Sequence, residues 1–295
     1  MKGKKMDISV NIAGVKLKNP IITASGTCGF GREMNEIFPI SALGAVAGKG
    51  TTLNAREGNP SPRIAETPSG MLNSVGLQNP GVDYFIENEL PFMKDAGATV
   101  IANIAGSTIE DYVETARKIS ATATDMVELN ISCPNVKNGG LAFGVDPKTV
   151  SEVTKRVKDV LRQPLIVKLS PNVTSITDIA LAAESAGADA VSLINTLLGM
   201  RIDIKTGKPV LANMFGGLSG PAVLPVAIRM VYQVSHAVKI PVIGMGGIIS
   251  AENVIEFMYA GAKAVMIGTA SIIDPAAPYK ILKDYEKLCE SGFFK

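Results

Sequence analysis

The chain has 295 residues, of which 46% are hydrophobic and 19% charged, so it belongs with folded globular proteins and not with disordered ones. Lys and Arg number 29 and Asp and Glu number 27, and no basic stripe interleaved with aromatic residues occurs, so nucleic acid is not an expected partner. Glycine accounts for 29 of the 295 residues, a larger share than the roughly 7% of an average protein. This excess predicts many tight turns or close backbone approaches.

The sequence predicts neither a signal peptide nor a membrane span. The basic cluster at Lys2, Lys4 and Lys5 is not followed by an apolar run. The longest uncharged stretch, residues 209–228, contains Asn213 and several Gly and Pro residues, which a membrane-spanning helix tolerates poorly. We therefore expect a soluble cytoplasmic protein that does not associate with membranes.

Cysteine and histidine are scarce. Cys28, Cys133 and Cys289 are far apart, whereas a disulfide framework, a structural zinc site or an iron–sulfur cluster needs closer or more numerous thiols, so we expect no bound metal. His236 is the single histidine, which leaves most hydrolytic mechanisms with one possible base. Apolar residues precede it at helical spacing, so we expect it at a helix end or an interface.

Eight short apolar runs, rich in β-branched residues, predict eight strands. They lie at residues 20–24, 45–48, 99–103, 126–131, 164–169, 190–194, 241–244 and 264–267. Their nearly continuous apolarity is typical of a parallel sheet that is covered by helices. Helices are expected between them at residues 108–121, 147–161, 176–186, 221–236, 251–259 and 275–290.

The junctions between these elements support the assignment. Four strands follow a Gly-Ala pair whose glycine would end the preceding helix in the left-handed conformation. These glycines are Gly44, Gly97, Gly187 and Gly261. Ser175 and Ser250 are expected N-caps, and Pro221 and Pro275 suit the first turn of a helix.

Strand–helix units repeated eight times over about 270 residues predict a single (β/α)8 barrel domain, residues 1–295, with a doubly wound open sheet as the alternative. Residues 8–17, with Ala13-Gly14 at their centre, predict a hairpin that plugs the bottom of the barrel. Two connections are long, at residues 51–91 and 195–220, and long loops in a compact domain are commonly functional. We expect both to lie over the active site.

Polar residues stand at the carboxyl ends of the predicted strands, where a (β/α)8 barrel carries its active site. They are Ser25-Gly26, Lys49-Gly50-Thr51, Asn103, Asn130, Lys168, Asn195-Thr196, Gly246-Gly247 and Gly268-Thr269. An unpaired polar group at such a buried position costs on the order of a few kcal/mol, which favours a binding site over packing as the reason for this ring.

The glycines after the last two strands suit a phosphate, because the loops after strands seven and eight are the common phosphate site of this fold. Neither GMGGII nor GFGREM fits the dinucleotide pattern G-x-G-x-x-G, so a mononucleotide phosphate is expected. The structural alternative for Gly246-Gly247 is a simple tight turn.

Lys49 and Lys168 are expected to point into one cavity. A cation there can stabilise the anionic reduced ring of a flavin or hold a substrate carboxylate. The structural alternative is an ion pair with Glu128, which lies two residues before Asn130 and therefore on the same strand face.

The segment NISCPNVKNGG, beginning at Asn130, places Cys133 just past a strand end. A lone cysteine is commonly an inert small apolar residue. Here the loop position and the neighbouring Asn130 and Asn135 favour a thiolate that can act as a general base. Cys28 lacks this framing, and Cys289 is expected to pack within the last helix.

This segment resembles class 1 dihydroorotate dehydrogenase. Other parts of the chain that resemble the same family are NSVGLQNPG from Asn73, the strand-end Lys49, the INT at Ile194 to Thr196, and the GMGG and IGTA segments. The resemblance extends over essentially the whole chain. It implies FMN in a (β/α)8 barrel and oxidation of (S)-dihydroorotate to orotate in the de novo pyrimidine (UMP) pathway. Cys133 then corresponds to the base that removes the proton from carbon 5, while hydride leaves carbon 6 for flavin nitrogen 5.

The resemblance also assigns binding roles. The implied orotate contacts are Lys49, Asn73, Ser74, Val75, Gly76, Leu77, Asn130, Asn195 and Thr196. The implied FMN contacts are Ser25, Lys49, Gly50, Asn103, Asn130, Lys168, Ile194, Gly220, Gly246, Gly247, Gly268 and Thr269.

The subclass follows from finer features. A cysteine at position 133 differs from the serine of the membrane-bound class 2, and VKNGG resembles class 1B, whereas fumarate-reducing class 1A typically carries a Pro-Gly-Lys-like stretch. Class 1B implies a catalytic-subunit homodimer inside a heterotetramer, with an electron-transfer subunit that carries FAD and a 2Fe-2S cluster and uses NAD.

Three alternatives stay open at this point. The chain could be a self-sufficient class 1A enzyme that uses fumarate, or a related flavin enzyme acting on another reduced pyrimidine such as dihydrouracil or a tRNA dihydrouridine. A tRNA substrate would require the basic surface that this chain lacks. The chain could also be a phosphate-binding barrel without catalytic activity.

Overall fold

Eight parallel strands close into a barrel in the computed structural model, which describes residues 6–132 and 143–292. Around the barrel the order is β3, β4, β7, β8, β9, β10, β13 and β14, and β14 pairs with β3. Their bounds are Ile21–Thr23, Ala45–Ala47, Val100–Ile104, Met126–Asn130, Leu165–Lys168, Ala190–Leu193, Val242–Met245 and Ala264–Ile267. All eight predicted strands are confirmed, and closure of the sheet rules out the doubly wound alternative.

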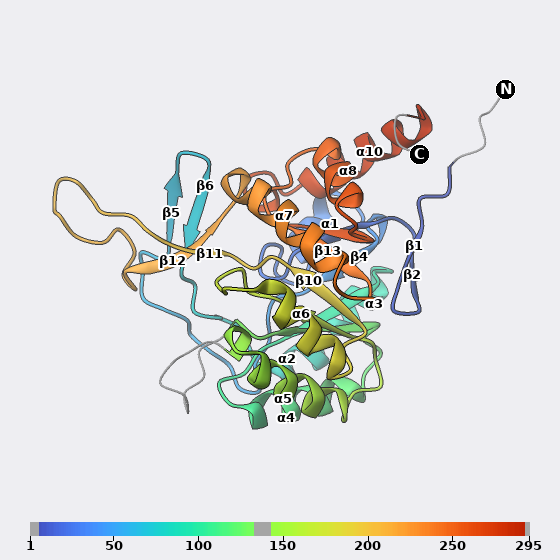
Figure 1. The fold of residues 1–295 in the computed structure, drawn as a ribbon, viewed down its shortest axis with the longest axis horizontal. Coiled ribbons are helices and arrows are strands. Elements are labelled where there is room, and N and C mark those ends of the chain that lie inside the picture. Colours follow the sequence, from blue (N-terminus) through green and yellow to red (C-terminus); the bar gives the residue numbers. More distant parts are fainter. Residues whose placement is uncertain (1–5, 133–142, 293–295) are drawn as a thin grey trace.

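Helices surround this barrel (Figure 1). The six predicted ones are α4 Ile109–Ser120, α5 Pro147–Lys158, α6 Ile176–Ser185, α7 Leu224–Ser235, α8 Ala251–Tyr259 and α10 Ala277–Glu290. The others are α1 Arg32–Ile37, α2 Val82–Tyr84, α3 Leu90–Asp95 and α9 Thr269–Ile273, together with the short turns η1 Ile40–Ala42, η2 Phe85–Glu89, η4 Phe143–Val145 and η5 Pro221–Val223. Within the two described ranges, no helix combines the length and apolar character that crossing a bilayer requires.

The helix starts agree with the predicted caps except at one proline. Ser175 accepts a hydrogen bond from the Asp178 amide, and Ser250 accepts one from the Asn253 amide. Pro221 begins η5, which leads into α7. The prediction for Pro275 is wrong, because α10 begins only after a turn that Asp274 closes by accepting from the Ala277 amide.

The prediction that four glycines end helices in the left-handed conformation is confirmed for three of them. Gly97, Gly187 and Gly261 have φ values of +75°, +97° and +102°. Gly44 is not in this region, so its prediction is wrong. Its requirement is spatial, because a Cβ there would overlap the backbone carbonyl of Asn19.

The predicted hairpin is present, as β1 Val10–Ile12 paired with β2 Val15–Leu17. Ile12 and Leu17 are fully buried and share a hydrophobic core cluster with barrel residues such as Met126 and Ala264, which begin their strands. The hairpin therefore plugs the amino-terminal end of the barrel, as predicted.

The two long connections contain strands that the sequence analysis did not predict. Residues 51–91 contain β5 Ile64–Thr67 and β6 Gly70–Asn73, and residues 195–220 contain β11 Leu197–Met200 and β12 Phe215–Ser219. The four strands form one antiparallel sheet in the order β11, β12, β6, β5. Pairing of β12 with β6 joins segments about 145 residues apart, a non-local contact that local sequence patterns do not announce.

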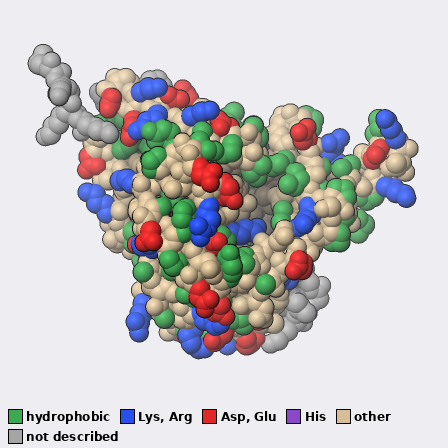
Figure 2. Space-filling model, turned by 180° about the vertical axis from the view of Figure 1, so that it is seen from behind, with side chains coloured by type: hydrophobic (Ala, Val, Ile, Leu, Met, Phe, Trp, Pro, Cys, Tyr) green, Lys and Arg blue, Asp and Glu red, His purple; other side chains and the backbone are tan. Residues whose placement is uncertain are grey.

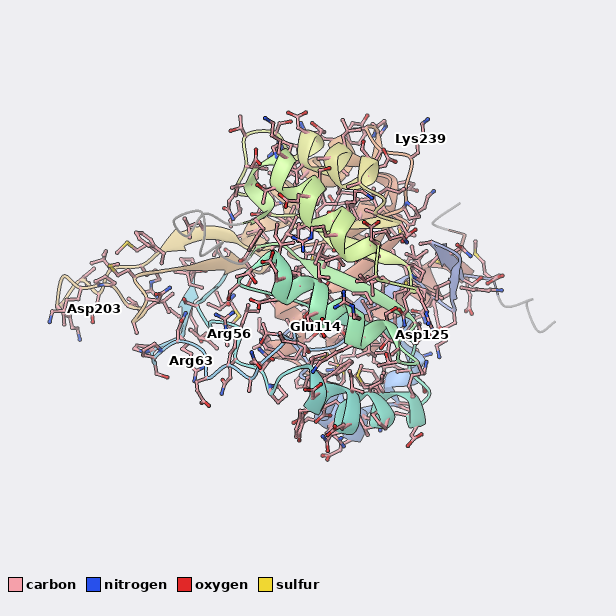
Figure 3. The ribbon with its side chains drawn as sticks, turned by 90° about the horizontal axis from the view of Figure 1, so that it is seen from below. Arg56, Arg63, Glu114, Asp125, Asp203 and Lys239 are labelled. Carbon is pink, nitrogen blue, oxygen red and sulfur yellow. The ribbon has the colours of Figure 1, made fainter. Side chains whose placement is uncertain are left out.

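This sheet lies at the end of the molecule opposite the hairpin (Figure 1). Figure 3 shows the same arrangement from another side. Asp203 is at the tip of the segment that projects from the body, while Asp125 and Lys239, which precede β8 and β13, lie at the far end. The sheet therefore covers the carboxyl ends of the barrel strands, where the active site was expected.

The plug hairpin provides a test of this architecture. Ile12→Ala should lower the free energy of unfolding by about 2–5 kcal/mol, because it removes a fully buried side chain from the barrel bottom. Lys16→Ala on the exposed side of β2 is the matched control and should change it by no more than about 0.5 kcal/mol. Chemical denaturation measures both, and equal effects would contradict the plug.

Candidate active site

A cavity of about 690 Å³ lies between the carboxyl ends of the barrel strands and the four-stranded sheet. Figure 2 shows this face hollowed between the barrel body and the projecting segment, with basic side chains inside the hollow. The volume falls within the roughly 300–1,000 Å³ typical of cofactor and ligand pockets.

Most of the predicted site residues line this cavity. They are Ser25, Lys49, Asn73, Ser74, Val75, Gly76, Leu77, Asn130, Lys168, Ile194, Asn195, Thr196, Gly220, Gly246, Gly247, Gly268 and Thr269. Gly50 and Asn103 are not among the lining residues and lie against each other, since a Cβ on Gly50 would approach Asn103 Oδ1 to 2.8 Å. Cys133 lies outside the described residues.

Two lysines supply positive charge to the cavity. Burial lowers the pKa of Lys49, and the nearby Lys168 cation lowers it further. Lys168 is almost completely buried, and its Nζ lies 4.0 Å from Glu128 Oε2. The ion pair offered as a structural alternative is therefore present, yet Lys168 also lines the cavity, so the two interpretations are compatible.

Glu128 holds a buried polar network just below the cavity. Its Oε2 accepts from Asn103 Nδ2 at 2.6 Å, and its Oε1 accepts from the Ser192 hydroxyl at 2.6 Å. Asn103 Oδ1 is buried and has no hydrogen-bond partner among the described residues. An unpartnered buried acceptor is costly, so this oxygen indicates a missing donor.

The two glycines after β13 have backbone conformations that other residues rarely adopt. Gly246 and Gly247 have φ values of +129° and +76°, and a Cβ on Gly247 would lie 2.7 Å from Leu224 Cβ. Within the described residues, no backbone carbonyl accepts from either amide. The chain bends at both glycines, which is compatible with the structural alternative, and their two N–H groups can bind a ligand.

Asparagine side chains rigidify the opposite wall. Asn195 Nδ2 donates to the Ser132 hydroxyl at 2.8 Å, and its Oδ1 accepts from the Thr196 amide at 2.8 Å. Asn172 Nδ2 donates to the Thr196 carbonyl at 3.0 Å. β12 passes this wall closely, because Gly217 has no side chain to overlap Thr196. The positions of Asn195 and Thr196 are therefore fixed by both barrel and sheet.

Several lining residues were not predicted from the sequence. Arg56, Asn59 and Asn213 belong to the long connections, and Asn59 Nδ2 and Asn213 Nδ2 both donate to the Ser74 hydroxyl at 3.1 Å. Figure 3 shows Arg56 on the side of the body that carries the projecting sheet. No local pattern marks these residues, because only the pairing of the two connections brings them together.

The two described cysteines and the histidine do not line the cavity. Burial raises the pKa of Cys28 to about 11, and its thiol donates to the Ala47 carbonyl. Cys289 is buried in the core, as predicted. His236 ends α7, where its ring packs on Tyr232, which agrees with the predicted helix end. Across residues 6–132 and 143–292, no three His, Cys, Asp or Glu side chains group as metal ligands.

The fold and the site thus define a (β/α)8 barrel with a cationic, amide-lined ligand cavity under a covering sheet. Residues 7–288 match the family model described as dihydroorotate dehydrogenase, and the chain belongs to that family.

Curated relatives cover nearly all of the chain. One from Anoxybacillus flavithermus is 59% identical over 97% of this chain and 92% of its own length, and one from Alkaliphilus metalliredigens is 58% identical over 99% and 96%. A third, from a Geobacillus species, is 60% identical over 91% and 86%. All three are named dihydroorotate dehydrogenase B (NAD(+)), catalytic subunit.

The glycine turn can be tested by adding one methyl group. Gly247→Ala should weaken binding of a phosphate-bearing flavin by tenfold or more, on the order of 1.4 kcal/mol, because its Cβ would collide with Leu224. Gly207→Ala is a matched control, since Gly207 also has positive φ, +68°, but no atom within 4 Å of its Cβ position. Flavin titration of the apoproteins measures both, and equal losses would refute a role for the turn.

Proposed function

We propose that this chain oxidises (S)-dihydroorotate to orotate in de novo pyrimidine (UMP) biosynthesis, with FMN bound in the cavity and NAD as the final electron acceptor. The observation that carries the proposal is the grouping of Lys49, Lys168 and the amide side chains at the carboxyl end of a barrel of this family. A proton abstraction and a hydride transfer both require such a site, sheltered from water and rich in fixed donors.

The residues present fit FMN. The unpartnered Asn103 Oδ1 can accept a hydrogen bond from a ring N–H, and Lys168 can stabilise negative charge on the pyrimidine edge. The free amides of Gly246 and Gly247, with Gly268 and Thr269 nearby, can hold the phosphate. The proposed set is completed by Ser25, Lys49, Gly50, Asn130, Ile194 and Gly220.

The proposed substrate contacts use the other half of the cavity. Lys49 pairs with the carboxylate of dihydroorotate, and Asn130, Asn195 and Thr196 hydrogen-bond its ring. Residues 73–77, at and after the end of β6, close over it from the sheet. The wall hydrogen bonds of Asn195 and Thr196 hold these groups before substrate arrives, which lowers the ordering cost of binding.

In the proposed reaction the Cys133 thiolate removes the proton from carbon 5 of dihydroorotate. When bound, FMN supplies the acceptor for the hydride that leaves carbon 6. Lys49 holds the carboxylate next to the reacting carbons and Asn130 orients the ring, so that the two C–H bonds break in a fixed geometry. The buried Tyr112 hydroxyl donates to the Asn130 carbonyl at 2.7 Å and fixes the backbone of that residue.

We further propose that electrons leave through a partner subunit that carries FAD and a 2Fe-2S cluster, within a heterotetramer built on a catalytic homodimer. The name of the relatives, catalytic subunit, supports a partner. Apolar side chains are exposed on and beside β11 and β12, among them Leu198, Ile204 and Phe215. They support a surface on this chain at which the partner subunit binds. Fumarate turnover by the isolated chain that rivals turnover by the NAD-linked complex would instead support class 1A.

The strands of the covering sheet lie in two connections between barrel strands, and residues of the sheet and the barrel line one cavity, which supports a single domain spanning residues 1–295. Cys28 and Cys289 are free thiols, which supports the proposed cytoplasmic location.

Replacement of the proposed base tests the reaction. Cys133→Ala should slow flavin reduction by dihydroorotate by about a hundredfold or more, since a positioned general base contributes about 10²–10⁴. Cys28→Ala is the matched control and should leave the rate unchanged, because that thiol has a raised pKa and faces a backbone carbonyl. Stopped-flow absorbance of the flavin measures the rate, and reduction of Cys133→Ala at the wild-type rate would exclude this base.

The lowered pKa of Lys49 predicts a pH dependence. Orotate requires protonated Lys49, so its affinity should fall as the pH rises through the pKa of this lysine, which lies below the usual value of about 10.4. In Lys49→Gln the affinity should be about tenfold weaker or more at neutral pH and should lack this alkaline decline. Flavin spectral shifts measure orotate binding. The surface control Lys16→Gln should bind orotate as the wild type does. If orotate affinity in Lys49→Gln still fell at alkaline pH as in the wild type, Lys49 would not be the group that pairs with the carboxylate.

A further inference from the structure

The barrel interior contains one buried carboxylate that no step above uses. Glu128 is fully buried in β8, level with Asn103 on β7 and two residues before Asn130, which pairs with Lys168 on β9. Among the described residues the other buried carboxylate is Glu89, which pairs with Arg32 outside the barrel. A carboxylate inside a barrel is costly, and its presence calls for a specific role.

The surroundings of Glu128 suit a hydrogen-bond acceptor at both of its carboxyl oxygens. Both of its oxygens accept, one from Asn103 Nδ2 and one from the Ser192 hydroxyl, each at 2.6 Å. Lys168 Nζ, 4.0 Å away, supplies the compensating positive charge. Glu128 therefore has partners on three other strands of the barrel, β7, β9 and β10.

These contacts have two consequences for the cavity. First, Asn103 must direct its amide nitrogen toward Glu128, which leaves its Oδ1 facing Gly50 as an acceptor without a partner. Second, Glu128 offsets one of the two cations, so that Lys49, Lys168 and Glu128 together carry a net charge of +1 in place of +2.

We propose that Glu128 is a positioning residue for the flavin, which orients the Asn103 amide and limits how strongly Lys168 stabilises the reduced ring. The inference rests on the proposed function, since it requires a flavin in the cavity. It goes beyond that function because Glu128 itself lies behind the cavity wall and acts through its neighbours. Its charge sets the flavin potential, and its length sets the direction of the Asn103 acceptor.

The charge can be removed without changing the shape. Glu128→Gln keeps an acceptor for Asn103 Nδ2 and offers a donor to the Ser192 oxygen, so the network and the fold are retained. With the anion gone, Lys168 stabilises the anionic reduced flavin more strongly, and the flavin midpoint potential rises. We expect the equilibrium constant for two-electron reduction to increase about tenfold, which corresponds to about 30 mV.

Two further variants separate charge from position. Glu128→Asp keeps the charge but is one methylene too short to hold both Asn103 and Ser192. Its reduction equilibrium should stay within about threefold of the wild type, while its FMN dissociation constant rises about three- to tenfold. Glu89→Gln removes a buried carboxylate outside the barrel and should change neither quantity.

The experiment is a spectroelectrochemical titration of the FMN-loaded full chain, with FMN affinity of the apoprotein measured by fluorescence quenching. A potential in Glu128→Gln that is unchanged or lower overturns the charge role, and an unchanged FMN affinity in Glu128→Asp overturns the positioning role. A purely structural residue would reduce flavin content without raising the potential. If the wild-type chain binds no FMN, the proposed function fails, whereas a wild type that binds FMN leaves the Glu128 outcomes as the test of this inference.

Discussion

The structure depends on one constraint, which is that every second residue of each barrel strand points into a closed interior. At the amino-terminal end these positions hold Ile101, Met126 and Ile166, which pack against the hairpin plug. Two residues further along the same strands the positions hold Asn103, Glu128 and Lys168. The lower half of the barrel is therefore an apolar core, and the upper half is a polar site whose groups must satisfy one another or a ligand.

The second organising feature is the sheet that covers this polar end. Gly217 on β12 pairs with Asn73 on β6, and the same strand passes closely over Thr196 at the barrel rim. Residues from two connections that are distant in sequence thereby reach one cavity. The covering sheet also shields part of the barrel end from bulk water, which strengthens the interactions of Lys49 and Lys168 with bound anions.

Much of the architecture could be predicted from local pattern. The strands are buried on both faces and therefore read as continuous apolar runs, and Ser175 and Ser250 mark helix starts. The sequence analysis did not predict the helical segment from α2 to α3, because Pro91 within it is typical of a helix end. The helix nevertheless continues, through the wider turn of η2. The missed sheet depends on pairing between distant segments, and its Gly-rich strand β12 carries almost no strand signal of its own.

The sequence by itself determined the repeated strand–helix units and the polar residues at the strand ends, because burial on both faces and the two-residue alternation are written into local composition. It also determined the family, through motifs that extend over the whole chain. Only the tertiary structure decided that Glu128 serves both Asn103 and Ser192 and that Asn59 and Asn213 meet at Ser74. These contacts join strands and connections far apart in sequence, and closure of the barrel and pairing of the sheet set their geometry.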